Sequence, residues 1–306
     1  MFDVVIIGNG PAGLSAAVYA KRAMLETVVI GKQAFLGGQI VNSEQVDNYL
    51  GLPGTKGFDL VMKFMSHAEE LGVIFREGMV TNVVDNGEYK TVELEQGEPL
   101  ETKTVLVASG AKYRLLGIEG EAEYAGAGVS YCATCDGAFH RGKDVAVIGG
   151  GDVALGDAVY LSKGCRNVYL IHRRNEFRGT KVLQERVREA ENIEFLPFYE
   201  VQEIHGGDVV EKITLRHNQT GEEKTLEVSG VFIAVGMEPQ TGFVKGVVPM
   251  DKAGYIIADE TGVTGTKGIF VAGDARTKKL RQVATAVSDG ANAVISIEEF
   301  LTGSLN

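Results

Sequence analysis

Hydrophobic residues near the N-terminus follow the pattern of an apolar strand, a glycine turn and a helix. Residues 2–7 form a short β-rich run, Leu14–Ala23 has helical spacing, and Thr27–Ile30 is a second apolar strand. This succession predicts a β-α-β unit. The turn between the first strand and the helix reads Gly8-Asn9-Gly10-Pro11-Ala12-Gly13.

Glycines at these positions suit a bound dinucleotide. They permit a tight turn and let backbone N–H groups approach a pyrophosphate at the helix N-terminus, where the helix dipole favours negative charge. An acidic residue that holds a ribose is expected about 20 residues further on, but the second strand ends in Gly31-Lys32-Gln33. A single turn of this kind is therefore weak support for a dinucleotide site.

The same pattern occurs again in the middle of the chain. A strand is predicted at Asp144–Ile148, and a helix continues through Ala158–Ser162. The turn between them, Gly149-Gly150-Gly151-Asp152-Val153-Ala154, reads G-x-G-x-x-A. Because the two turns strengthen each other, the sequence predicts an α/β protein with two Rossmann-like dinucleotide-binding domains.

Three arginines follow the next strand of this second unit. The strand Val168–Ile171 runs directly into His172-Arg173-Arg174-Asn175-Glu176-Phe177-Arg178. Arginines there favour the 2′-phosphate of NADPH, because a guanidinium group pairs with phosphate oxygens in a fork. The alternative is a solvated cluster of charge at the start of a helix.

Composition and charge narrow the class of protein. The 306 residues are enough for two domains, and 44% hydrophobic with 23% charged residues is the balance of a globular protein. A formal net charge of −11 argues against a nucleic-acid partner, since such binding depends on Lys and Arg contacts to phosphate. No apolar run approaches the roughly 20 residues of a membrane span, and no basic leader precedes the first strand. We expect a cytoplasmic protein that does not bind membranes.

A pair of cysteines lies between the two units, in Tyr131-Cys132-Ala133-Thr134-Cys135-Asp136-Gly137. Two cysteines at this spacing can interconvert between disulfide and dithiol, and Asp136 can supply or take the proton that the exchange requires. The alternative is half of a zinc site, which needs four ligands. Only Cys165, His140 and His172 remain as candidates, so no metal is expected, and Cys165 is expected to be a half-buried inert thiol.

The order of these motifs resembles the low-molecular-weight thioredoxin reductases of the bacterial and archaeal type, in class II of the pyridine nucleotide-disulfide oxidoreductases. The likeness runs essentially from end to end. It also includes Gly37-Gly38-Gln39, Asn48-Tyr49 before Pro53, Ala108-Ser109-Gly110, Val235-Gly236-Met237-Glu238-Pro239, Gly273-Asp274-Ala275 and Leu280-Arg281-Gln282.

The resemblance implies an FAD-binding domain of residues 1–114 and 245–306, with an NADPH-binding domain inserted at 115–244 that carries the dithiol. In this likeness Asp274 holds the ribityl or phosphate region of FAD, and Arg281 and Gln282 contact its flavin end. The implied FAD site comprises Gly8, Gly10, Pro11, Ala12, Gly13, Gly37, Gly38, Gln39, Asn48, Gly273, Asp274, Arg281 and Gln282. The implied NADPH site comprises Gly149, Gly151, Asp152, Ala154, His172, Arg173, Arg174 and Arg178.

The implied activity is that of a thioredoxin reductase. Electrons pass from NADPH through FAD to the Cys132/Cys135 disulfide and on to a thioredoxin or thioredoxin-like dithiol protein, with Asp136 as the acid/base and a homodimer as the assembly. Which cysteine faces the flavin stays open. One arrangement cannot serve both flavin and protein partner, so a domain rotation is expected, with hinges near Arg114–Gly120 and Met237–Phe243.

One stretch departs from the family pattern. Residues 153–158 read Val-Ala-Leu-Gly-Asp-Ala, where the family usually shows a Ser or Thr and then paired glutamates. A weakened NADPH site is compatible with a reductase of the same architecture that is fed by ferredoxin or another donor. A third possibility from a different class is a flavin redox sensor whose dithiol reports its state without turnover.

Overall fold

The chain forms two compact units in a computed structural model that describes residues 1–32, 37–43 and 46–304. Unit 1 comprises Met1–Lys112 and Glu238–Asn306, and unit 2 comprises Tyr113–Met237. The resemblance places the end of the insert at residue 244, but residues 238–244 belong with unit 1, where Val244 is part of the core. Gln33 lies outside the described residues.

Unit 1 contains a mixed sheet with a parallel centre. Strands β3, β2, β1, β6 and β17 pair in parallel, and β5 and β4 continue the sheet from β6 as antiparallel strands. Their bounds are β1 (Phe2–Ile7), β2 (Thr27–Gly31), β3 (Ile74–Glu77), β4 (Val80–Asp85), β5 (Lys90–Leu94), β6 (Leu100–Val107) and β17 (Ile269–Val271).

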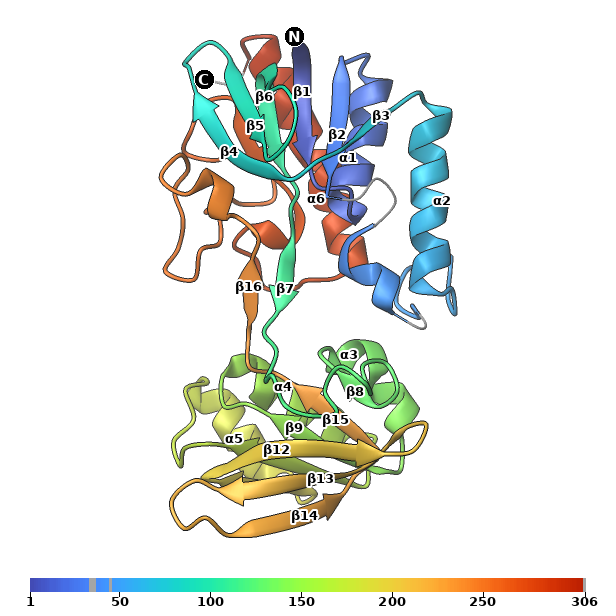
Figure 1. The fold of residues 1–306 in the computed structure, drawn as a ribbon, viewed down its shortest axis with the longest axis vertical. Coiled ribbons are helices and arrows are strands. Elements are labelled where there is room, and N and C mark those ends of the chain that lie inside the picture. The colour runs from blue at the N-terminus through green and yellow to red at the C-terminus, as the bar shows by residue number, and fades with distance from the viewer. Residues whose placement is uncertain (33–36, 44–45, 305–306) are drawn as a thin grey trace. The chain divides into compact units, whose positions relative to one another are not determined.

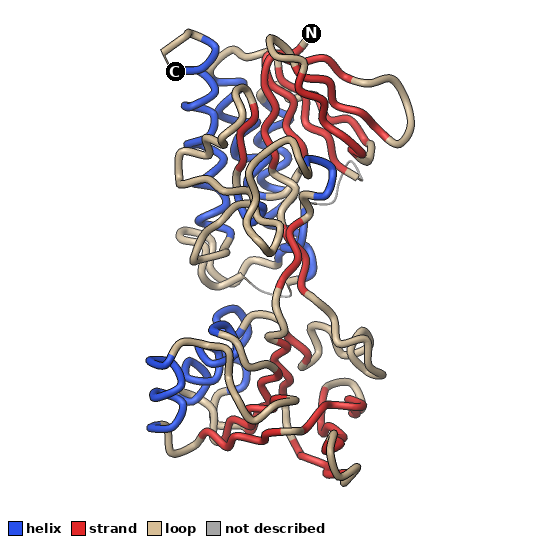
Figure 2. Tube along the Cα trace, turned by 90° about the vertical axis from the view of Figure 1, so that its left-hand side faces the viewer, coloured by secondary structure: helices blue, strands red, loops and turns tan. Residues whose placement is uncertain are grey.

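The alternation of side chains along β1 separates two apolar cores in unit 1. Val4 and Ile6 face the cluster formed with the helices, whereas Val5 and Ile7 face the cluster formed with β4 and β5. The α-helices of this unit gather on one face of its sheet (Figure 2). They are α1 (Pro11–Arg22), α2 (Gly57–Glu70) and α6 (Val283–Leu301). The short 3-10 helices are η1 (Gly38–Asn42), η4 (Gly273–Ala275) and η3 (Gly242–Val244), of which η3 packs Val244 into the cluster with β4 and β5.

Unit 2 repeats this plan on a smaller scale. Its sheet is parallel in the order β11-β10-β9-β15-β8, with helices packed on one face and a three-stranded antiparallel sheet, β12-β13-β14, on the other (Figure 1). The strands are β8 (Val129–Ser130), β9 (Asp144–Ile148), β10 (Asn167–His172), β11 (Ile193–Pro197), β12 (Tyr199–Gly206), β13 (Val210–His217), β14 (Glu223–Glu227) and β15 (Gly230–Ile233). The helices are α3 (Ala133–Asp136), η2 (Gly137–His140), α4 (Asp152–Ser162) and α5 (Lys181–Glu189).

The chain enters and leaves unit 2 through two short strands that pair with each other. β7 (Ala111–Tyr113) leads in and β16 (Met237–Pro239) leads out. The N–H of Arg114 donates to the carbonyl of Gly236 at 3.0 Å. Both connections therefore lie side by side.

These features confirm the α/β class and the two strand–glycine turn–helix units expected from the sequence. The central strands β1 and β9 are covered on both faces of their sheets, so they are continuous Val- and Ile-rich runs rather than alternating ones. Within the described residues, no helix is both long and apolar enough to cross a membrane.

Candidate functional site

The first glycine turn brings α1 unusually close to β1. A Cβ on Gly13 would lie 1.8 Å from the carbonyl oxygen of Gly8, and Gly8 has a φ of 114° with Ala108 O 2.3 Å from its ideal Cβ. A Cβ on Gly10, in contrast, would have its nearest neighbour among the described residues at 3.7 Å, the carbonyl oxygen of Gly37. α1 begins at Pro11 with no side-chain cap. The turn therefore presents N–H groups at a helix N-terminus with room beside Gly10 for an anion.

Buried polar atoms without hydrogen-bond partners gather in the loops of unit 1. Among the described residues they include Ser109 Oγ after β6, Asp274 Oδ1 after β17, and Arg281 Nε before α6. Burial raises the pKa of the Asp274 carboxyl. Since buried polar atoms normally have partners, these three mark where a ligand with donors and acceptors would bind, beyond the carboxyl ends of the central strands.

A buried charge cluster that the sequence analysis missed holds the Asp274 loop in place. Asp289, on α6, is 4% exposed and accepts the Gly273 N–H at 2.9 Å and Lys278 Nζ at 2.8 Å. It also pairs in a fork with Arg276, through Nε at 2.8 Å and Nη2 at 2.7 Å. Burial alone would raise the pKa of Asp289, but the hydrogen bonds from Arg276 and Lys278 keep it below its ordinary value.

Arg281 is held by groups that the sequence pattern does not reveal. Its guanidinium carbon lies 4.2 Å from the ring centroid of Tyr255, and its two terminal nitrogens donate to the carbonyls of Lys278 and Arg276 at 3.2 and 3.3 Å. Its Nε–H is buried and has no partner among the described residues. The side chain is thus fixed, with this buried N–H left for a ligand.

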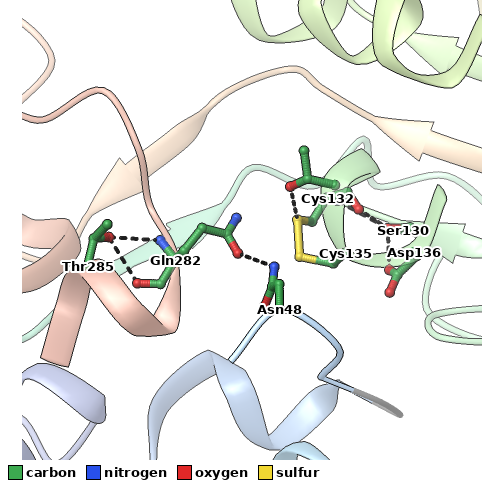
Figure 3. The surroundings of a disulfide bond; sticks show 8 residues. Asn48, Ser130, Cys132, Cys135, Asp136, Gln282 and Thr285 are labelled. Atoms are coloured by element: carbon green, nitrogen blue, oxygen red, sulfur yellow. Dashed lines mark hydrogen bonds between the residues drawn. A yellow bond between two sulfur atoms is a disulfide. The ribbon is translucent and has the colours of Figure 1, made fainter. Parts of the chain in front are cut away.

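The other predicted flavin-site residues also lie in unit 1. A Cβ on Gly37 would lie 2.0 Å from Val61, and Gln39 donates to the carbonyl of Ala111. Asn48 Nδ2 donates to Gln282 Oε1 at 2.9 Å, and Gln282 caps α6 (Figure 3). These hydrogen bonds join segments that lie far apart in the sequence, residues 39 and 111 in one case and 48 and 282 in the other.

Cys132 and Cys135 form a disulfide across the single turn of α3, with a Cα–Cα distance of 5.3 Å (Figure 3). Ser130, which the sequence analysis missed, bridges the site: its hydroxyl donates to Asp136 Oδ2 at 2.5 Å and accepts the Cys132 N–H at 3.1 Å. Thr134 Oγ1 lies 3.4 Å from Cys132 Sγ. With the two sulfurs bonded to each other and an acid beside them, the geometry is that of a redox pair rather than half of a zinc site.

The second glycine turn is built like the first but is more open. Gly149 has a φ of 148°, and an ideal Cβ on it would lie 2.4 Å from Ala234 O and 2.8 Å from the Ala154 Cβ. A Cβ on Gly151 would meet nothing within 4 Å. Asp152 accepts the Thr180 N–H at 2.7 Å, which ties α4 to the loop before α5.

The three arginines surround the end of β10. Arg173, Arg174 and Arg178 are exposed, and the Arg178 N–H donates to the carbonyl of Gly150 at 2.7 Å, which holds their loop against the turn. His172 is 6% exposed, and its Nε2 has no partner among the described residues. Burial first, and then Arg178, Arg173 and Arg174, lower its pKa, so the ring is neutral inside a cationic loop.

The departure from the family pattern at residues 153–157 changes the side chains that α4 presents. Val153 is 60% exposed, and a Cβ on Gly156 would meet nothing within 4 Å. Burial raises the pKa of Asp157 to about 7. This helix thus presents few polar groups close to the turn.

Cys165 is a free cysteine and is more buried than the sequence suggested, at 7% exposure. Burial and then Asp144 raise the pKa of its thiol. A buried thiol in this state is inert, as expected.

Comparison with known proteins agrees with this geometry. The family model described as "Pyridine nucleotide-disulphide oxidoreductase" matches residues 2–290. The chain is 41% identical to the thioredoxin reductase of Bacillus subtilis over 98% of this chain and 95% of that one, and 40% identical to that of Listeria innocua over 98% and 94%. A crystal structure of the thioredoxin reductase from Streptococcus pyogenes MGAS5005 is 42% identical, with a TM-score of 0.94 over 99% of both chains. The chain therefore belongs to the thioredoxin reductases of the pyridine nucleotide-disulphide oxidoreductase family.

Proposed function

We propose that this protein is an NADPH-dependent thioredoxin reductase that uses FAD and the Cys132/Cys135 pair. The observation that carries the proposal is the disulfide itself, with Asp136 held beside it by Ser130, in a chain with two glycine turns. The names of the similar proteins supply the substrate, a thioredoxin. A homodimer and a cytoplasmic location belong to the same proposal, the first from the family resemblance and the second from redox use of a Cys-x-x-Cys.

Unit 1 fits FAD. Its glycine turn has room beside Gly10 for a pyrophosphate, and Asp274 Oδ1, which has no partner in the described part of the chain, can accept hydrogen bonds from ligand hydroxyls. Arg281 Nε and Ser109 Oγ add polar contacts for the same ligand. The proposed FAD residues are those of the first turn, Gly37–Gln39, Asn48, Gly273, Asp274, Arg281 and Gln282.

Unit 2 fits NADPH. The turn at Gly149–Ala154 is open at Gly151, and three exposed arginines stand at the end of β10, where a 2′-phosphate would meet them. The partnerless Nε2 of neutral His172 adds one polar contact. The proposed NADPH residues are Gly149, Gly151, Asp152, Ala154, His172, Arg173, Arg174 and Arg178.

A bound flavin supplies a carrier that can take a hydride from a nicotinamide and pass two electrons to a disulfide. The chain's own part begins with the Cys132/Cys135 dithiol. One thiolate attacks a sulfur of the disulfide in thioredoxin and forms a mixed disulfide. The other thiolate then displaces thioredoxin, which leaves with two thiols, and the Cys132–Cys135 disulfide closes. Asp136 can take the proton from each attacking thiol and return one to each thioredoxin sulfur that leaves as a thiolate, and Ser130 fixes its carboxylate.

An anaerobic titration tests the proposal. The oxidised holoprotein is titrated with NADPH and, separately, with NADH, and thioredoxin is then added. We expect NADPH to bleach the flavin. About two pairs of electrons should be taken up per protein, one by the flavin and one by the disulfide, and thioredoxin should then restore the oxidised spectrum. Failure of thioredoxin to reoxidise the protein would contradict the proposed substrate.

A second candidate is a reductase of the same architecture with another electron donor. Val153 and Gly156 favour it, because they place no polar side chain on α4 beside the nucleotide turn. Bleaching by dithionite but by neither nucleotide would select this candidate. A sensor without turnover would instead bleach normally but reduce thioredoxin slowly at saturating concentration.

A further inference from the structure

Glu121 is a buried carboxylate of unit 2 outside both the redox pair and the nucleotide turn. It is 3% exposed. Its Oε1 accepts the Leu116 N–H at 3.0 Å and the Tyr131 hydroxyl at 2.9 Å, and its Oε2 accepts the Gly117 N–H at 2.7 Å. Three donors offset the cost of burying a charge.

These donors come from two separate segments of the chain. Leu116 and Gly117 follow β7, the strand by which the chain enters unit 2, whereas Tyr131 immediately precedes Cys132. The Tyr131 ring also stacks on Tyr113, with 5.1 Å between centroids and 17° between planes. Residues 113–117, the entry segment, therefore contact Tyr131 in two ways. Tyr113 stacks on its ring, and Leu116 and Gly117 are linked to its hydroxyl through Glu121.

Tyr131 acts as a constant donor in this contact. Burial first, and then the hydrogen bond and charge of Glu121, raise the pKa of its phenol well above the ordinary value. The phenol therefore stays protonated at any pH at which the protein functions. The contact between Tyr131 and Glu121 does not open by titration of the phenol.

We propose that Glu121 is a positioning residue for the redox pair, which fixes the Cys132 end of the disulfide to the entry segment through Tyr131. The inference rests on the proposed redox function of Cys132 and Cys135. Two thiols that are held close together form a disulfide more readily, because their effective concentration is higher. Loosening the Cys132 end therefore favours the dithiol.

The contact also bears on the hinge expected at Arg114–Gly120. Leu116 and Gly117 are bonded to Glu121 inside unit 2, and Tyr113 stacks on Tyr131, so the whole entry segment belongs to the body that carries the dithiol. A rotation of that body would therefore turn about residues that precede Tyr113, before the expected hinge. The dithiol and the entry segment then move as one piece.

The test is a thiol–disulfide equilibrium of the holoprotein with dithiothreitol. The two thiols of dithiothreitol give up two electrons and two protons and close into a cyclic disulfide, while Cys132 and Cys135 become thiols. Alkylation traps the mixture, and mass spectrometry gives the ratio of dithiol to disulfide. Neither NADPH nor thioredoxin is added.

Two variants break the contact with little change of shape. In Glu121→Gln, either amide orientation sets an N–H of the glutamine against the N–H of Leu116 or Gly117. Tyr131→Phe removes only the hydroxyl and keeps a ring to stack on Tyr113. The matched control is Glu123→Gln, which makes the same change of charge at an exposed position two residues away.

We expect both variants to shift the equilibrium constant toward the dithiol by about 3-fold to 10-fold, the size of one hydrogen bond. The double variant should shift it no further than the larger single change, since both act through one contact. Glu123→Gln should match the wild type. An unchanged constant in Glu121→Gln or in Tyr131→Phe, even with a lower melting temperature, overturns the proposal and leaves Glu121 as a loop contact alone.

Failure of the proposed function gives a different result. A wild-type protein that does not reduce thioredoxin, with variants that still shift the dithiothreitol equilibrium, would contradict the thioredoxin reductase activity and leave the role of Glu121 intact. Normal reduction of thioredoxin by the wild type, with variants whose dithiothreitol equilibria are unchanged, would support the thioredoxin reductase activity and contradict the role of Glu121.

Discussion

The two glycine turns share their first two motif glycines, Gly8 and Gly10 in one and Gly149 and Gly151 in the other, but have very different surroundings. Beside the first, Ser109, Asp274 and Arg281 present buried atoms without partners among the residues that the structure describes, and the Asp289 cluster holds the Asp274 loop. Beside the second, the arginines are exposed, and α4 presents an exposed Val153. The turn fixes where a pyrophosphate can bind. Its surroundings fix whether the ligand is enclosed and retained or solvated and exchanged, so the first site suits a resident cofactor and the second a substrate.

The last position of each turn, Gly13 in the first and Ala154 in the second, shows the same contrast at the level of packing. Gly13 cannot carry a Cβ because Gly8 O would lie 1.8 Å away, whereas Ala154 occupies the equivalent place in the second turn. The first helix therefore approaches its strand more closely than the second.

The largest expected effect comes from Gly13→Ala. The added methyl would overlap the Gly8 carbonyl, so we expect the free energy of unfolding to fall by more than about 4 kcal/mol and little folded flavoprotein to form. Gly10→Ala is the control, because its Cβ would make only an ordinary contact, 3.7 Å from Gly37 O. Urea unfolding of the two apoproteins measures both, because Gly10 itself lies in the proposed FAD site. Equal stability of the two variants would show that close approach is not what distinguishes the first turn.

Asp289→Asn should have the next largest effect. It leaves Arg276 and Lys278 buried with only a neutral partner, and we expect a loss of about 3 kcal/mol in the free energy of unfolding and faster release of FAD. Glu299→Gln, an exposed change of charge on the same helix, should alter neither quantity. Retention of FAD at the wild-type rate would contradict the idea that this cluster builds the enclosed site.

Arg178→Ala tests the exposed site. Loss of a charge-assisted contact to a 2′-phosphate should raise KM for NADPH by about 10-fold to 100-fold and leave KM for NADH unchanged. Arg186→Ala removes an exposed arginine on α5 and serves as control. A parallel rise for both nucleotides would mean that the arginine does not read the 2′-phosphate.

Asp157→Asn should have the smallest effect, and it depends on pH. Burial raises the folded-state pKa of Asp157 to about 7, above its unfolded value near 3.8, so the folded protein binds more protons between these values. The stability of the wild type therefore falls as pH rises from about 4 to 7, and the variant lacks this slope. Chemical unfolding at pH 4 and pH 8 should show the variant gaining stability relative to the wild type at the higher pH. A pH-independent difference would show that Asp157 is not buried as an acid.

Much of the fold and the redox centre could be predicted from the sequence. The strands at residues 2–7 and 144–148, both glycine turns and the Cys132/Cys135 pair are encoded by neighbours in the chain, and the structure places each where the pattern indicated. The groups that hold the sites could not be predicted in this way. Asp289 contacts Gly273 across 16 residues, and Glu121 reaches Tyr131 across 10.

The sequence by itself determined the class of fold, the two dinucleotide turns and the redox cysteines, because each depends on short-range periodicity or spacing. Only the tertiary structure decided that Ser109, Asp274 and Arg281 share the loops beyond one sheet edge, that Asp289 collects two cations and a backbone N–H, and that Glu121 joins the entry segment to Tyr131. The physical reason is that a buried polar atom is satisfied by whatever the fold brings within hydrogen-bond distance. No local pattern specifies that partner.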